Sequence, residues 1–320
     1  MMEKMTKGSA MLGIQSIASF LPKGRVDNLE QADRLEASRD FVEHKIGVTS
    51  LPRFEEHDSV VSASVTAFEN LCKKVSINSA EIECVVLCTQ NPDGGGLPHN
   101  SALIHGALGL SEDCACFDIG LGCSGYVYGL SVIQSFMAAN GMKKGLLFTC
   151  DPYSRILNND DKNTCLLFGD AASVTLISDM PRYTLSNAKF STKGIGADAL
   201  QKNGDLLEMN GRAVFNFALQ DVPKQIKRTL KSAEMTEEDV DLFLLHQGSR
   251  FMLENTIKRA GIPAEKAPIK LSATGNTVSS SIPLLLESEL DKAPETILMS
   301  GFGVGLSWAT AIYTQVKLFK

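Results

Sequence analysis

Short apolar runs alternate along this chain with longer stretches of helical periodicity. The short runs have the length of buried strands, and we expect strands at 84–89, 115–119, 145–150, 173–177, 242–246, 296–300 and 310–316. Strands that alternate with helical stretches are typical of parallel sheets with helical crossovers. The pattern therefore predicts an α/β fold.

Two of the intervening stretches predict helices with one buried face. Over residues 125–140, Tyr126, Leu130, Ile133 and Met137 lie on one stripe, and Gly141 is typical of a helix end. Over residues 212–233, apolar side chains recur at every fourth position. We expect one continuous helix in each stretch.

The second half resembles the first in the order and spacing of its parts, as a pattern and not by residue identity. The first half has IECVVLC, CFDIGLGCSG, GLLFTC and LLFGDAASVTLIS, and the second has VDLFLLH, IKLSATGNTV, TILMSGFGVG and LSWATAIYTQV. No Pro-rich or Ser-rich linker separates the two series. We therefore expect two fused half-domains, 1–178 and 179–320, that share one core.

Composition and charge narrow the class of protein. The 320 residues are 44% hydrophobic and 21% charged, which excludes a disordered or fibrous chain. A formal net charge of -6 argues against a protein that coats nucleic acid. The sequence has neither a membrane-length apolar stretch nor a secretory signal pattern near residue 1. We expect a cytoplasmic protein without membrane or nucleic-acid partners.

The eight cysteines are scattered, and several lie in apolar runs. In a chain of this length, such cysteines are typical of small core residues rather than a disulfide framework. Cys114 and Cys116 form a C-x-C pair without a matching Cys or His pair nearby. We therefore expect neither a metal site nor a cofactor.

Cys123 lies between a predicted strand and a predicted helix, in the segment FDIGLGCSG. The positive end of a helix dipole and its unpaired backbone N–H groups favour a thiolate at such a position. Gly122 and Gly125 leave room for a substrate. The pattern indicates a nucleophile, although a small residue packed in a tight turn would give the same sequence.

Three other segments follow predicted strands at the equivalent end of the sheet. His246 ends an apolar run, Asn276 lies in a loop of small residues, and GFGVG occupies 301–305. Each alone is typical of a structural role. With Cys123 they can line one cleft, because ligands of α/β sheets bind at the carboxyl ends of the strands. A nucleophilic cysteine with two hydrogen-bond donors for one carbonyl oxygen suits acyl transfer through an enolate.

The chain resembles β-ketoacyl-acyl carrier protein synthase III, of the thiolase superfamily. The motifs that carry the resemblance span most of the chain and are CSGYVYGL around Cys123, LLFGDAAS at 166–173, MNGRAVFNFA at 209–218, LLHQ ending at Gln247, GNTVSSSIP at 275–283 and GFGVGLSWA at 301–309. The resemblance implies a thiolase-like five-layered αβαβα fold, built from two pseudo-equivalent halves and assembled as a homodimer.

The resemblance also implies a reaction. Cys123 would take an acyl group from a short or medium acyl-CoA, and this group would condense with malonyl-acyl carrier protein to give 3-oxoacyl-acyl carrier protein and carbon dioxide. His246 and Asn276 would hold the malonyl thioester carbonyl during decarboxylation. The backbone N–H groups of Cys123 and Val304 would form the oxyanion hole.

The binding residues follow from the same resemblance. The expected CoA-binding residues are Phe41, Lys45, Lys162, Asn210, Gly211 and Phe217. Phe41 stands where the family usually has Trp, and Lys45 and Lys162 stand where it usually has Arg, which changes the nucleotide clamp. Leu97, after three glycines, matches the residue that floors the acyl pocket across the dimer. Arg250 lies next to the position of the family's carrier-docking arginine, which is Phe251 here.

Two other functions stay open. A relative with the same fold could pass the acyl group to an oxygen or nitrogen nucleophile, or the chain could be a non-catalytic partner subunit. The presence of Asn276 favours condensation, since simple acyl transfer needs a base more than a two-donor site. Asp93, which has no charged partner nearby in the sequence, is interpreted as a solvated loop charge.

Overall fold

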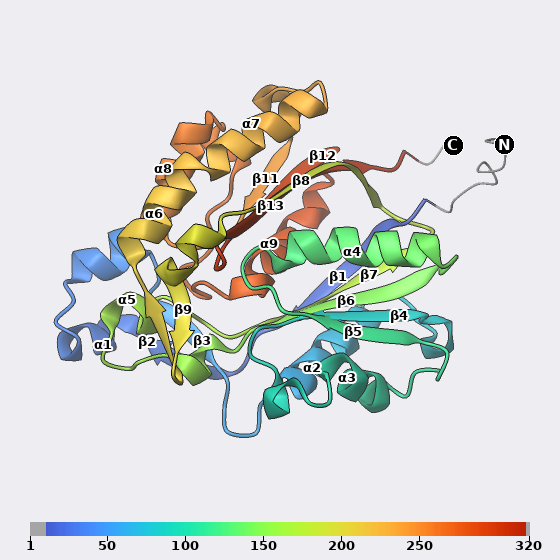
Figure 1. The fold of residues 1–320 in the computed structure, drawn as a ribbon, viewed down its shortest axis with the longest axis horizontal. Coiled ribbons are helices and arrows are strands. Elements are labelled where there is room, and N and C mark those ends of the chain that lie inside the picture. Colours follow the sequence, from blue (N-terminus) through green and yellow to red (C-terminus); the bar gives the residue numbers. More distant parts are fainter. Residues whose placement is uncertain (1–10, 318–320) are drawn as a thin grey trace.

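The computed structural model describes residues 11–317. Helices and sheet alternate in five layers, as Figure 1 shows. The outer helices on one side are α2 (Val60–Cys72) and α3 (Asn100–Leu108), the central helices are α4 (Gly125–Ala139) and α9 (Ser281–Glu289), and the outer helices on the other side are α6 (Gly211–Gln220), α7 (Val222–Ser232) and α8 (Arg250–Ala260). The predicted αβαβα fold is confirmed.

Nine strands form one hydrogen-bonded sheet. Their spatial order is β11 (Leu242–Leu245), β12 (Thr296–Gly303), β13 (Ser307–Gln315), β8 (Tyr183–Thr192), β1 (Gly13–Phe20), β7 (Ala172–Ser178), β6 (Lys144–Cys150), β4 (Cys84–Cys88) and β5 (Ala115–Ile119). The sheet bends between β8 and β1, where only Gly13 and Ile14 pair with Thr184 and Tyr183.

The strand pairings of residues 11–178 and 179–317 are similar, except that β5 has no counterpart in the second segment. The pairs β4·β6 and β11·β12 are parallel. In the first segment, β7 pairs antiparallel with both β6 and β1. In the second segment, β13 pairs antiparallel with both β12 and β8. The division between residues 178 and 179 falls between β7 and β8. We keep two half-domains with this boundary as a proposal.

Three apolar clusters occupy the spaces between the layers. Tyr126, Leu130, Ile133 and Met137 of α4 are fully buried in the central cluster, as the stripe predicts. The outer cluster beneath α6, α7 and α8 contains Cys123. The predicted nucleophile is therefore itself part of the hydrophobic core.

One predicted helix is divided in the structure. The stretch 212–233 forms α6 and α7, which meet at Asp221. Pro223 lies in the first turn of α7. Proline lacks the N–H that a helix interior needs but fits a first turn, so the chain begins a new helix there.

The remaining elements are short. They are the hairpin strands β2 (Gly24–Asp27) with β3 (Ser50–Arg53) and β9 (Leu200–Asn203) with β10 (Leu206–Met209), the helices α1 (Asn28–Arg34) and α5 (Lys162–Cys165), a π-helix at Phe41–Ile46, and short 3-10 helices at Ser79–Glu81, Asp93–Gly96, Tyr153–Ile156, Gly194–Ala199, Glu237–Asp239, Ala264–Lys266, Val278–Ser280 and Leu290–Lys292. The two hairpins gather with α1 and α5 at the left of Figure 1, beside the end of α6.

Candidate active site

Cys123 follows β5 and lies two residues before the first residue of α4. The glycines of β12 approach this turn closely. A Cβ atom on Gly303 would lie 2.7 Å from the Cys123 sulfur, and one on Gly301 would lie 2.7 Å from the Cys123 carbonyl oxygen. The GFGVG motif is therefore needed for backbone contact with the cysteine, and no phosphate-binding role is required to explain it.

His246 directly follows β11, and its backbone N–H donates to the Ser300 carbonyl of β12 at 2.9 Å. Its ring meets Phe302 edge to face, with the centroids 5.5 Å apart. The ring Nδ1 lies 2.7 Å from the Ser281 hydroxyl at the start of α9. Nε2 has no hydrogen-bond partner within residues 11–317, so it is the nitrogen available to a substrate.

Asn276 is held by the LLFGD segment. Its backbone N–H donates to the Leu167 carbonyl at 2.9 Å, and its carbonyl accepts from Gly169 at 3.1 Å. The side-chain Oδ1 accepts the backbone N–H of Val278 at 2.9 Å. This bond fixes the carboxamide and leaves its NH₂ group as the free end.

A cavity of about 190 Å³ brings the three side chains together. Cys123, His246 and Asn276 all line it, although they come from segments far apart in the sequence. Most of the remaining wall is apolar and includes Ile46, Leu200, Met209, Val214 and Met252. The cavity therefore combines a thiol and two polar groups with an apolar passage.

Burial decides the charge of the cysteine and the histidine. It raises the pKa of Cys123 to about 12, and the charge of Asp151 adds to the rise, while hydrogen bonds from the N–H groups of Val304 and Cys123 oppose it. Burial lowers the pKa of His246 to about 3. The prediction that the helix end favours a resting thiolate is wrong, because desolvation outweighs the two N–H groups.

Sequence reasoning missed Asp151, a fully buried carboxylate behind the nucleophile. It accepts the Gln90 N–H at 2.6 Å and the Ser279 hydroxyl at 2.5 Å. Burial raises its pKa to about 6. A charged residue directly after the predicted strand 145–150 was the signal available in the sequence.

Three of the expected binding residues, Phe41, Lys45 and Gly211, line the same cavity. Phe215 and Phe251 line it as well and stack with their ring centroids 5.3 Å apart and an interplanar angle of 11°. The Lys45 ammonium lies 5.8 Å from the centre of the Phe251 ring. The aromatic stack was not predicted, because its two rings come from different helices.

Two expected binding residues have structural contacts instead. Asn210 caps α6, where its side chain accepts the Ala213 N–H at 3.1 Å. Phe217 packs edge to face on Trp308, with the centroids 5.1 Å apart, and is 4% exposed. Neither side chain lines the cavity.

The two remaining basic residues lie outside the cavity wall. The Lys162 ammonium donates to the Glu36 carbonyl at 3.2 Å. The Arg250 guanidinium lies 3.8 Å from the Glu254 carboxylate on the same helix. Both residues are partly exposed.

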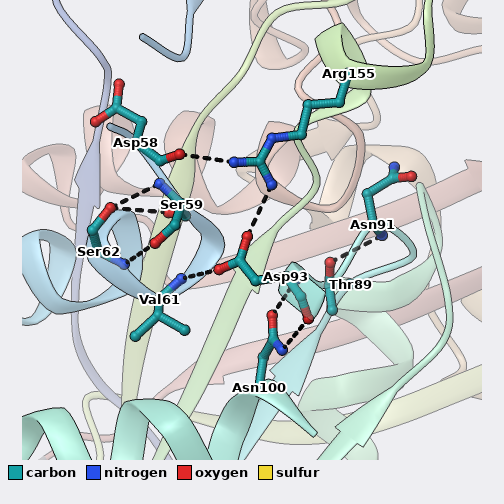
Figure 2. Close-up of polar contacts among 9 residues, drawn as sticks. All are labelled: Asp58, Ser59, Val61, Ser62, Thr89, Asn91, Asp93, Asn100 and Arg155. Atoms are coloured by element: carbon teal, nitrogen blue, oxygen red, sulfur yellow. Dashed lines mark hydrogen bonds and ion pairs between the residues drawn. The ribbon is translucent and has the colours of Figure 1, made fainter. Parts of the chain in front are cut away.

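Leu97 is 89% exposed and lies at the end of a loop. The base of this loop is Asp93, which is fixed by hydrogen bonds and an ion pair. Figure 2 shows that base: the Asp93 carboxylate binds Arg155 at 2.9 Å and the Val61 N–H at 3.1 Å. The Asn100 side chain accepts from the Asp93 N–H at 2.7 Å and donates to its carbonyl at 3.0 Å. Asp93 is therefore a structural anchor, and its interpretation as a solvated charge is wrong.

Other expectations concern metals, disulfides and membranes. All eight cysteines are free thiols. Residues 11–317 contain no group of three or more His, Cys, Asp or Glu side chains that could hold a metal ion. In the same residues, no helix has the length and apolar character needed to span a membrane.

A five-layered fold with a cysteine, a histidine and an asparagine around one cavity defines the thiolase-like class of condensing enzymes. Models of 3-oxoacyl-[acyl-carrier-protein] synthase III match residues 117–194 and, for its C-terminal part, 230–315. The β-ketoacyl-[acyl-carrier-protein] synthase III of Streptococcus sanguinis is 31% identical over 94% of this chain and 98% of its own. The synthase III of Streptococcus suis is 30% identical over 93% and 97%.

Solved structures agree. A 3-oxoacyl-(acyl-carrier protein) synthase from Burkholderia xenovorans superposes with a TM-score of 0.89 at 32% identity and covers 95% of this chain and 94% of its own. A 3-oxoacyl-(acyl-carrier-protein) synthase III superposes with a TM-score of 0.88 at 30% identity over 96% and 100%. The chain belongs to the 3-oxoacyl-[acyl-carrier-protein] synthase III family.

Proposed function

We propose that this protein condenses an acyl group from acyl-CoA with malonyl-acyl carrier protein, with the release of CoA and carbon dioxide. The observation that supports this most is the meeting of Cys123, His246 and Asn276 in one cavity of a family-type fold. No metal or cofactor takes part in the proposed steps.

In the first step, the Cys123 sulfur attacks the thioester carbonyl of acyl-CoA. A new sulfur–carbon bond forms, the bond to the CoA sulfur breaks, and the thiol proton leaves with CoA. The N–H groups of Cys123 and Val304, which already interact with the sulfur, hold the negative oxygen of the tetrahedral intermediate. Each such donor typically contributes on the order of 3 kcal/mol.

In the second step, the malonyl thioester carbonyl accepts hydrogen bonds from His246 Nε2 and the Asn276 NH₂ group. The carbon–carboxylate bond breaks, and its electron pair forms an enolate that these donors stabilise. The enolate carbon attacks the acyl-Cys123 carbonyl and expels the sulfur, which takes up one proton. The low pKa of His246 supports its role as a neutral donor.

The apolar passage fits the thin, flexible arm that CoA and the carrier protein share. Phe41, Lys45 and Gly211 have the better support as CoA contacts, since they line the cavity. Lys162, Asn210 and Phe217 stay in the proposal on the family resemblance alone. Arg250 stays as a carrier contact on the same ground.

We also propose a homodimer, in which Leu97 of one protomer floors the acyl pocket of the other. Within residues 11–317, β5 is an edge strand, and all five of its residues are only partly buried. Unpaired edges of this kind are usually covered. Leu97 is exposed on a loop whose base is anchored, as such a contact requires. We also propose that the protein is cytoplasmic.

Two measurements test the reaction. Intact-protein mass spectrometry after addition of acyl-CoA should show one acyl group, and Cys123→Ala should remove it. Carbon dioxide release from malonyl-acyl carrier protein should be lost in His246→Ala and Asn276→Ala, which keep acylation. Acyl transfer to another nucleophile without carbon dioxide would support the alternative acyltransferase. A wild-type protein that gains no acyl group would support the partner subunit.

A further inference from the structure

Ser281 is the side chain that faces the inner nitrogen of the proposed catalytic histidine. Its Oγ lies 2.7 Å from His246 Nδ1, and both residues are 3% exposed. Within residues 11–317 this is the only hydrogen bond of the Ser281 side chain. The hydroxyl therefore has no competing acceptor for its proton.

A neutral imidazole carries one proton, on either of its two nitrogens. If the proton is on Nδ1, it points at Ser281, and Nε2 presents a lone pair to the substrate oxygen. If it is on Nε2, that nitrogen donates to the substrate, and Nδ1 must accept from Ser281. Because the proposed enolate step needs a donor at Nε2, the direction of the Ser281 hydrogen bond decides whether the step is assisted.

The position of Ser281 favours the second arrangement. It is the first residue of α9, a helix of nine residues. The positive end of a helix dipole favours a lone pair over an N–H group at a neighbouring atom. Burial also disfavours the imidazolium, which would supply a proton on both nitrogens.

We propose that Ser281 is a positioning residue that donates its hydroxyl proton to His246 Nδ1 and so keeps the imidazole proton on Nε2. This inference rests on the proposed function, in which Nε2 donates to the malonyl thioester. Ser281 does not touch the substrate, and it acts only through the histidine.

The neighbouring residues fit this assignment, because one short segment orients both donors. The N–H of Val278 binds Asn276 Oδ1 and points the carboxamide NH₂ away from the backbone. Val278 has a φ of 53°, a left-handed conformation that a β-branched residue rarely adopts. The backbone of the segment is therefore strained at Val278, the residue that fixes Asn276.

The other serines of the segment have different partners. Ser279 donates to Asp151 at 2.5 Å. The Ser280 hydroxyl lies 2.8 Å from the Thr149 hydroxyl and 3.2 Å from the Thr149 and Ala171 carbonyls. Only Ser281 reaches the imidazole. Ser288, on the same helix, donates to the Leu285 carbonyl at 2.8 Å and offers a matched control.

The first test measures the tautomer without substrate. Nitrogen NMR of the full protein, labelled with ¹⁵N at histidine, should show a protonated Nε2 and an unprotonated Nδ1 for His246, assigned by the loss of its signals in His246→Gln. A proton on Nδ1 in the wild-type protein would overturn the inference. Because no reaction takes place, this result is independent of the proposed function.

The second test separates the hydroxyl from the shape of the side chain. In Ser281→Ala and Ser281→Val, kcat for carbon dioxide release should fall roughly 10- to 100-fold, less than the 100- to 1,000-fold typical of deleting an oxyanion donor. Acylation of Cys123 should change less than about twofold in both, because it does not use His246 Nε2 in the proposal. Ser281→Thr restores a hydroxyl and should recover most of kcat, and Ser288→Ala should match the wild type.

The outcomes distinguish this inference from the proposed function. Unchanged kcat in Ser281→Ala, or equal losses in the folded Thr and Val variants, would overturn the positioning role. If the wild-type protein is acylated and releases no carbon dioxide, the proposed function fails, and the NMR result still decides the direction of the hydrogen bond. Thermal melts identify variants that fail to fold, in which case Ser281→Cys, a weak donor of similar size, replaces them.

Discussion

At the scale of single residues, burial sets the protonation of the groups that meet in the cavity. Cys123 is a neutral thiol and His246 a neutral imidazole near pH 7, since their pKa values move to about 12 and about 3. These pKa values therefore disfavour a thiolate–imidazolium pair. In the proposed mechanism, stabilisation of the tetrahedral oxyanion by the two N–H groups drives acylation, rather than a resting thiolate.

The raised pKa of Cys123 predicts how its reactivity depends on pH. Only the thiolate is alkylated, so the rate of modification by iodoacetamide should rise about tenfold per pH unit from pH 6 to 9 without a plateau. Mass spectrometry of the Cys123 peptide measures this rate. Cys72, which is exposed, is an internal control for accessibility to the reagent. A plateau near pH 7 for Cys123 would contradict the neutral thiol.

Asp151 gives a prediction about stability. Its pKa rises from 3.8 to about 6 on folding, so the folded protein binds the proton more tightly than the unfolded chain. Stability from this group is present below pH 3.8 and is lost as the pH rises through about 6. The shift corresponds to roughly 3 kcal/mol.

Asp151→Asn removes this penalty and keeps an oxygen acceptor for the Gln90 N–H. Its melting temperature relative to wild type should be higher at pH 8 than at pH 4, as calorimetry can measure. Asp93→Asn is the contrasting variant, because it breaks an ion pair with Arg155 and should lower the melting temperature at pH 8. An Asp151→Asn difference that does not change with pH would show that this carboxyl does not titrate on unfolding.

At the scale of elements, the contact between β12 and the turn before α4 gives a steric prediction. A methyl group on Gly303 would lie 2.7 Å from the Cys123 sulfur, closer than Cβ atoms come to any neighbour. Gly303→Ala should therefore reduce acylation of Cys123 by at least about 100-fold, since even small displacements of reacting groups cost this much.

Gly106→Ala is the matched control, because a Cβ atom there meets no atom within 4 Å. Alanine in the interior of α3 should leave acylation unchanged and raise stability by about 0.5–1 kcal/mol. Intact-protein mass spectrometry compares the two variants. Normal acylation in Gly303→Ala would mean that the cysteine turn can move away from β12.

The elements that were predicted and those that were missed differ in burial. The strands β4, β6 and β7 were expected because nearly every residue in them is buried and each contains a run of apolar residues. The strands β1 and β8 were missed, since exposed and polar positions interrupt their apolar residues. The break at Asp221 was missed as well, because Val222 and Ile226 continue the apolar spacing of α6 across it.

The site shows the same division. Cys123, His246 and Asn276 were identified together because each follows a predicted strand at the equivalent end of the sheet and lies in a motif that carries the family resemblance. Ser281, Asp151 and the Phe215–Phe251 stack depend on contacts between distant segments, and no local pattern marks such contacts. The charge states of Cys123 and His246 could not be predicted from the sequence either, because desolvation depends on the surrounding fold.

At the scale of the whole molecule, the two proposed half-domains divide the site: the cysteine belongs to one, and the histidine and asparagine belong to the other. The cavity between them needs both halves. The proposed dimer adds a further contribution, since Leu97 belongs to a loop that is exposed on its own protomer. In this proposal, acyl-chain preference is a property of the dimer and not of one protomer.

This arrangement predicts a change in acyl preference when Leu97 is altered. Leu97→Phe should shift acylation toward shorter acyl-CoA substrates, and Leu97→Ala toward longer ones. Each methylene that gains or loses a buried place is worth about 0.8 kcal/mol, which is roughly a fourfold change in relative rate. A panel from acetyl-CoA to octanoyl-CoA, read by intact-protein mass, measures the shift. Leu206→Ala changes an exposed leucine on the hairpin of β9 and β10 and should keep the wild-type profile.

The assembly must be measured beside the chain-length profile. Light scattering should give twice the mass of a 34.5 kDa chain for the wild type and for all three variants. A monomer with normal acylation would contradict the shared pocket, because Leu97 could not reach a neighbouring site. A dimer in which the Phe and Ala variants keep the wild-type profile would place Leu97 outside the acyl pocket. If the partner's Leu97 floors the acyl pocket, both Leu97 variants stay dimeric and their chain-length preferences shift in opposite directions.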